Sequence, residues 1–118
     1  MTPEEFVAAL ATLCRDAAVD DCVSVFEQPP GRQPSAHLVE LSKWFKTLTQ
    51  RDRELVVAAM REAADATLFG ALCVIDGVRS IESGSEKSEF HLSATRNGFE
   101  NQISPSGTYL HDILRADL

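Results

Sequence analysis

Residues 49–75, TQRDRELVVAAMREAADATLFGALCVI, decide the fold of this chain. At about 100° of rotation per residue, the stretch predicts one long helix that is amphipathic in its first half and apolar on nearly every side in its second. The face expected to point inward consists of Val56, Met60, Ala63, Thr67, Ala71 and Val74. On the opposite face, Leu68, Phe69 and Leu72 replace the charged residues of the first half. Apolar surface left in water costs roughly 25 cal/mol per Å², so we expect other elements to enclose this end of the helix.

Length and composition predict one globular domain. The chain has 118 residues, of which 44% are hydrophobic and 25% charged, as in ordinary soluble proteins. The formal net charge is −7, and the acidic groups concentrate in residues 1–30. A surface of this sign repels phosphate backbones and anionic lipids. We therefore expect neither nucleic acid nor membrane as a partner, and a basic protein surface is the compatible one.

The sequence predicts a cytoplasmic protein with reduced thiols. Glu4 and Glu5 lie where a signal peptide would be basic, and no run reaches the ~20 apolar residues that span a bilayer. The three cysteines, Cys14, Cys22 and Cys73, cannot all pair with one another. Two of them lie on apolar helix faces, so we expect free thiols that pack in the core.

Two further helices are predicted before the long one. Residues 2–5 (TPEE) form a capping box that starts a helix ending near Val19. Its expected buried face contains Phe6, Leu10, Leu13 and Ala17. The short segment from Cys22 to Glu27 fits either a helical turn or an edge strand. Gln28–Ala36 holds three of the five prolines and reads as a loop, and a second helix follows from about Ser35 to Leu48.

After the long helix the hydrophobic period changes from 3.6 to 2, which predicts strands. Three are expected: Val78–Glu82, Glu89–Arg96 and Phe99–Ser104. Asn97 and Gly98 form a strong hairpin signal between the last two. Tyr109–Leu114 reads as a short closing helix. The expected fold is α+β, with three N-terminal helices packed on a three-stranded antiparallel β-meander and a short C-terminal helix.

No catalytic or metal-binding motif is present, so we expect no metal and no cofactor. The histidines are His37, His91 and His111, and none has the i, i+4 or HxH spacing that lets two imidazoles share a metal. Glycine-rich phosphate loops and nucleophile elbows are also missing.

One set of polar residues could serve an enzyme or a small-ligand binder with a pocket between the long helix and the sheet. The set consists of Cys73, Asp76, Arg79 and His91. An activated thiolate needs access and nearby positive charge, whereas Cys73 lies in the most apolar stretch of the chain. Core packing is therefore the better interpretation of Cys73, and a charge pair across the helix-to-strand corner is the better interpretation of Asp76 and Arg79.

The predicted function is that of a small acidic cytoplasmic binding protein that occludes a protein partner, as bacterial immunity proteins, antitoxins and acidic secretion chaperones do. The expected partner-binding residues are Asp20, Asp21, Glu27, Arg32 and Trp44. Tryptophan is enriched at interface hot spots, although it also serves as the amphipathic rim of a core. Two alternatives stay open: the enzyme or ligand binder described above, and a structural subunit that completes a homodimer core.

Overall fold

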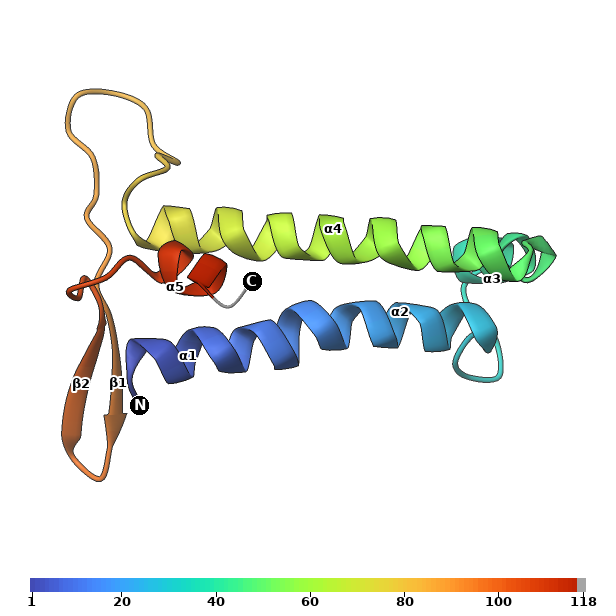
Figure 1. Ribbon diagram of the computed structural model, residues 1–118, viewed down its shortest axis with the longest axis horizontal. Coiled ribbons are helices and arrows are strands. Elements are labelled where there is room, and N and C mark those ends of the chain that lie inside the picture. Colours follow the sequence, from blue (N-terminus) through green and yellow to red (C-terminus); the bar gives the residue numbers. More distant parts are fainter. Residues whose placement is uncertain (117–118) are drawn as a thin grey trace.

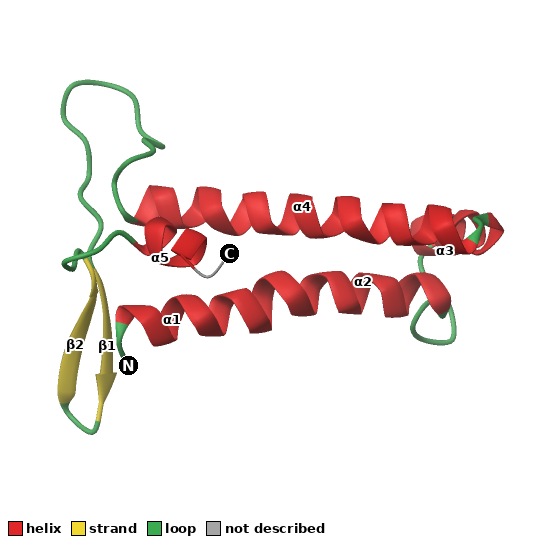
Figure 2. Ribbon diagram, viewed as in Figure 1, coloured by secondary structure: helices red, strands yellow, loops and turns green. Residues whose placement is uncertain are grey.

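The computed structural model describes residues 1–116 and is mostly helical (Figure 2). Its elements, in chain order, are α1 (Pro3–Leu10), the π-helical segment η1 (Ala11–Asp16), α2 (Ala17–Glu27), α3 (Ala36–Thr47), α4 (Gln50–Ile75), β1 (Leu92–Arg96), β2 (Phe99–Ser104) and α5 (Leu110–Ala116). The helices α1, η1 and α2 follow one another without a break and form one long rod. The fold is thus a helical α+β arrangement with an antiparallel hairpin of two strands in the described part of the chain.

The long N-terminal rod and α4 lie side by side and run in opposite directions (Figure 1). At one end α3 joins them, and it packs mainly on α2. At the other end the short α5 lies between α1 and α4, and the β1–β2 hairpin projects beyond them. The molecule is therefore elongated, with principal extents of 48 × 39 × 31 Å.

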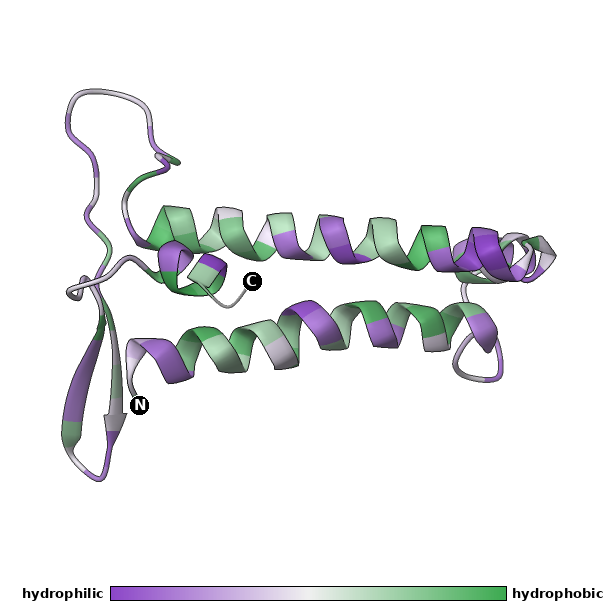
Figure 3. Ribbon diagram, in the orientation of Figure 1, coloured by the Kyte–Doolittle hydropathy of each residue, from purple (hydrophilic) through white to green (hydrophobic). Residues whose placement is uncertain are grey.

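The main core lies at the hairpin end, where the apolar half of α4 meets α1, β2 and α5. Its fully buried side chains are Val7, Leu72, Ile103, Leu110 and Leu114. Leu68, Phe69 and Ile75 pack against this cluster from α4. Hydrophobic colouring dominates the end of α4 beside α5, whereas α5 itself is partly hydrophobic and partly hydrophilic (Figure 3). Other elements therefore cover the Leu72 side of this helix end as predicted, whereas Ala71 on another side remains exposed.

The predicted long helix is confirmed, but the predicted inward face is wrong. The helix spans Gln50–Ile75, and the hydroxyl of Thr49 caps its start by accepting from the amide of Asp52 at 3.1 Å. Ala63, Thr67 and Ala71 are exposed, although the hydrophobic period placed them inside. The rod packs instead on the side of α4 that carries Asp65, because ion pairs and the Leu72 core lie there.

The N-terminal helix is longer than predicted. It continues to Glu27, because Asp20 and Asp21 point into solvent and do not interrupt the pattern of Val19 and Val23. Cys22–Glu27, left open between helix and strand, is helical. Other expected core positions are wrong: Leu13 is 72% exposed, and Cys14 and Cys22 are exposed free thiols.

The three-stranded meander is wrong at its first strand. Val78–Glu82 is irregular and exposed, and the Glu82 carboxylate accepts from the amide and hydroxyl of Ser88 at 2.6 and 2.8 Å. These bonds fold the connection on itself and leave it without a strand partner. Phe99–Ser104 is confirmed as a strand, and it pairs with Leu92–Arg96 through a turn in which Asn97 and Gly98 have φ of 52° and 80°. The helices do not cover a sheet face, since Ile103 is the hairpin residue that enters the buried cluster and Leu92 and Ala94 only border it.

Leu72→Ala should lower the free energy of unfolding by about 2–5 kcal/mol, because it removes a fully buried side chain and leaves a cavity. Leu55→Ala is the matched control on the same helix, since Leu55 is 50% exposed, and it should cost under about 1 kcal/mol. Urea unfolding of both variants measures the difference. Equal costs would show that the apolar end of α4 is not the core.

Candidate functional site

The residues predicted to bind a partner lie on α2, on the loop that follows it and on α3. Asp20, Asp21 and Glu27 are exposed on α2, and Arg32 is exposed in the loop that leads to α3. Trp44 lies on α3 with 48% of its surface exposed. The five residues thus come from three successive segments that turn around one end of the rod.

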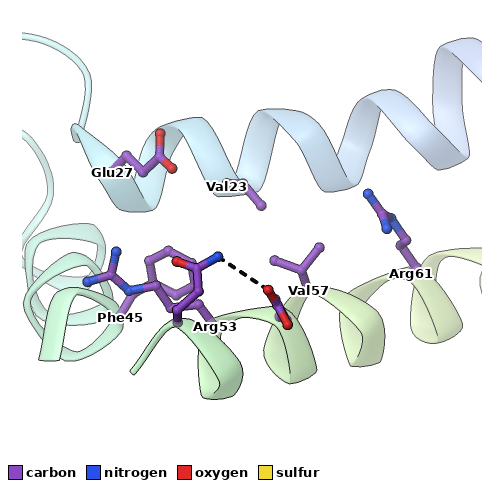
Figure 4. Close-up of a pocket in the computed structure, with 8 residues that line it drawn as sticks. Val23, Glu27, Phe45, Arg53, Val57 and Arg61 are labelled. Atoms are coloured by element: carbon purple, nitrogen blue, oxygen red, sulfur yellow. Dashed lines mark hydrogen bonds between the residues drawn. The ribbon is translucent and has the colours of Figure 1, made fainter. Parts of the chain in front are cut away.

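An open pocket of about 360 Å³ lies at the same end, between α2, α3 and α4 (Figure 4). It is lined by Val23, Glu27, Phe45, Gln50, Arg53, Glu54, Val57 and Arg61. The side chains of Val23 and Glu27 extend from α2 toward the pocket, and those of Val57 and Arg61 extend toward it from α4. Of the predicted partner-binding residues, Glu27 is the one that lines this pocket. Pockets of about 300 Å³ or more with apolar walls and a few polar groups are typical binding sites.

The floor of the pocket depends on how α3 docks on α2. Ser42, which is buried, donates its hydroxyl proton to the carbonyl oxygen of Phe26 at 2.6 Å. The rings of Phe26 and Phe45 pack with their centroids 5.7 Å apart. The loop at 28–35 reverses the chain, and Ser35 caps α3 by accepting from the amide of Leu38 at 3.2 Å. These contacts fix Phe45, 2% exposed, beneath the pocket.

Two arginines of α4 give the pocket its polar character. The guanidinium of Arg53 lies 5.6 Å from the centre of the Phe45 ring, and its Nη2 donates to the carbonyl oxygen of Lys46 at 2.9 Å. Its Nε has no hydrogen-bond partner among residues 1–116. Arg61 points across toward α2 and makes no ion pair with any residue of 1–116. The pocket therefore offers cationic groups that the chain itself leaves partly unsatisfied.

A charge cluster lines a further open pocket, of about 470 Å³, between the long helices. Asp65 of α4 accepts from Arg15 Nη1 at 3.1 Å and from Arg115 Nη1 at 2.7 Å. Hydrogen bonds and charge from Asp16 and from Asp65 raise the pKa of Arg15 above its ordinary value, against the opposing effect of burial. The Arg115 guanidinium also lies 4.2 Å from the centre of the Phe69 ring. The cluster ties η1, α4 and α5 together, so its role is structural.

Asp76 has a role that the sequence reasoning missed. Its side chain is 1% exposed, and its two oxygens accept from the amides of Leu110 and His111 at 3.0 and 2.9 Å. Its Oδ2 also lies 2.6 Å from Nδ1 of His111, and since a carboxylate only accepts, that nitrogen carries the proton. Asp76 is therefore the N-terminal cap of α5, supplied from the end of α4. The available signal was the start of α5, where Tyr109 occupies the position that a capping side chain normally fills.

The alternative catalytic residues are dispersed. Cys73 is 5% exposed, and its carbonyl oxygen accepts from the amides of Val78 and Arg79. The Arg79 guanidinium packs against Gly70, where a Cβ would lie 2.5 Å from Nη1. The His91 side chain is 59% exposed and lies 3.7 Å from Glu89. Asp76 is bonded to α5, so the predicted pairing of Asp76 with Arg79 across the corner is replaced by the pairing with His111.

Comparison with known proteins assigns no family. No protein-family model matches the sequence, and no curated protein or solved structure is significantly similar to it. Within residues 1–116, no three His, Cys, Asp or Glu side chains come together in a way that could hold a metal ion. The helices of the same region are each too short or too polar to cross a bilayer.

Asp76→Ala should lower the free energy of unfolding by about 2 kcal/mol or more, because α5 loses its cap and a buried imidazole N–H loses its acceptor. Asp112→Ala is the control: its 61% exposed carboxylate lies 3.4 Å from the other His111 nitrogen, and an exposed pair contributes under about 1 kcal/mol. Chemical denaturation of both variants is the measurement. Similar losses for both would contradict the capping role of Asp76.

Proposed function

We propose that this protein is a binding protein that occludes a protein partner, with the pocket between α2, α3 and α4 as its anchor point. The observation that carries the proposal is the open pocket of about 360 Å³, in which charged groups frame the buried ring of Phe45; exposed Trp44 precedes Phe45 on α3. Such a combination suits one protruding side chain of a partner, which would bury its apolar part and pair its polar end.

The acidic residues of α2 favour a basic partner, whereas the pocket lining itself balances Glu27 and Glu54 against Arg53 and Arg61. Asp20 and Asp21 are exposed on α2, and Glu27 stands at the pocket itself. Exposed charges of one sign steer a partner of the opposite sign and increase its association rate. The pocket lining contains no serine, threonine, cysteine or histidine, and its ionisable side chains are Glu27, Glu54, Arg53 and Arg61.

Reversing the acidic charge should slow partner association. The partner is first isolated from extracts of the source cells with the tagged protein as bait. The association and dissociation rate constants are then measured with the purified protein and the purified partner. For Asp20→Lys/Asp21→Lys, we expect association about tenfold slower at low salt, with a dissociation rate that changes much less. Raising the salt should slow the wild type and shrink this difference, because screening at physiological ionic strength acts over about 8 Å.

The matched control reverses two acidic residues at the other end of the molecule. Glu86→Lys/Glu100→Lys makes the same change in net charge at exposed positions of the connection and of β2. It should leave the association rate close to that of wild type. Rates that respond equally to both double variants, or to neither, would remove the acidic α2 surface from the mechanism.

Trp44→Ala should weaken the complex by about 2 kcal/mol, or roughly thirtyfold in Kd, because exposed tryptophans are enriched among interface hot spots. The melting temperature of the free protein should change little. A large fall in melting temperature with unchanged Kd would instead identify Trp44 as the rim of the α2–α3 core.

A further inference from the structure

A second groove, distinct from the anchor pocket, opens on one flank of the paired long helices. It has a volume of about 410 Å³ and is lined by Cys14, Arg15, Ala18, Ala64, Thr67, Leu68 and Ala71. We propose that this flank is the interface with a second copy of the chain, so that two helix pairs stack into a symmetric dimer with a four-helix core. These seven residues form the apolar groove.

The exposed area of the chain shows that a dimer interface is available. The accessible surface is 8311 Å², whereas a compact monomer of this mass exposes about 6300 Å². The radius of gyration is 18.4 Å, compared with about 13.5 Å for a compact domain of this length. A standard interface needs about 800 Å² from each partner, and obligate dimers use more. The excess of about 2000 Å² per chain is larger than either interface needs from one partner, although the exposed connection 77–91 and the hairpin also contribute to it.

The α4 side of the apolar groove has the spacing of a helix-packing seam. Met60, Ala64, Thr67 and Ala71 are separated by four, three and four residues, the alternation that keeps one face toward a partner helix. Thr67 and Ala71 are exposed, and Met60 and Ala64 are only half-buried, so the described chain leaves this seam uncovered. Short side chains allow helix axes to approach to about 8 Å. A helix pair from a second copy would therefore fit closely against it.

The charge of the apolar groove favours a second copy over a basic partner. In a symmetric dimer the same patch faces itself, so any uncompensated charge would meet its own like charge. Arg15 is the ionisable side chain with a permanent charge in the lining, and it is already paired with Asp16 at 2.9 Å and with Asp65 at 3.1 Å. The groove is thus nearly neutral on a chain whose net charge is −7. The acidic residues that would attract a basic partner lie elsewhere, on the exposed surface of α2.

Two glutamate substitutions on α4 test this interface. Ala71 lines the apolar groove, whereas Ala66 is exposed on another side of the same helix and does not line it. We expect a mass of about twice 12.9 kDa for wild type and Ala66→Glu in sedimentation equilibrium, and a dimer at least about tenfold weaker for Ala71→Glu. Both variants should keep the helical circular dichroism of wild type, because glutamate is a good helix former.

The outcomes that would overturn the proposal are a monomeric wild type up to millimolar concentration, or a dimer that Ala66→Glu weakens and Ala71→Glu does not. The second result would place the interface on the other flank of α4. Either result leaves the anchor pocket unaffected, so the failure of this proposal is distinguishable from failure of the proposed function.

The two exposed cysteines of the N-terminal rod provide a second test without any substitution. Cys14 lines the apolar groove, whereas Cys22 lies eight residues farther along and does not line it. At concentrations that favour the dimer, alkylation of Cys14 should be at least about tenfold slower than in the diluted protein, and the rate at Cys22 should stay the same. A Cys14 rate that is independent of protein concentration would contradict the proposed interface.

Discussion

The buried carboxylate of Asp76 fixes the position of α5, and the rest of the fold depends on that position. The two long helices contact each other directly over only part of their length, and α5 supplies Leu110 and Leu114 to the core between them. A helix as short as α5 is not stable alone. The Asp76 carboxylate accepts hydrogen bonds from the first amides of α5 and from the His111 ring. Arg115, also on α5, pairs with Asp65 at 2.7 Å. The end of α4 thereby determines where the C-terminal segment packs.

This construction concentrates the core at one end and leaves the middle and the opposite end open. Near the hairpin, α1, β2 and α5 pack against the apolar half of α4. Toward α3 the rod contacts α4 directly through η1 and α2, and the anchor pocket lies over Phe45. Between them, the cluster of Arg15, Asp65 and Arg115 replaces apolar packing with ion pairs. A chain with so small a core gains stability from any partner that covers its exposed apolar surface, which is why both proposals concern association.

The two proposed surfaces differ in chemistry. In the proposed function, the acidic residues of α2 would steer a basic partner, and the anchor pocket would accept one of its side chains. The apolar groove is nearly neutral, because Asp65 and Asp16 already pair with Arg15. Long-range attraction therefore belongs to the first surface and close helix packing to the second. Since they lie at different places on the rod, the chain has room to associate with itself and with a partner at the same time.

The sequence by itself determined the elements whose signals are local. The cap at Thr49, the long helix, the second helix and the Asn97-Gly98 hairpin all depend on residues a few positions apart, and the structure confirms them.

Only the tertiary structure decided which helix faces are buried. Ala63, Thr67 and Ala71 satisfy the period of an inward face but remain exposed, because Asp65 pairs with arginines 50 residues away in both directions and draws the other side of α4 inward. Asp76 likewise finds His111 35 residues away, and such a pairing has no local pattern. Val78–Glu82 has strand periodicity but no partner strand, and a strand exists only where another one satisfies its backbone.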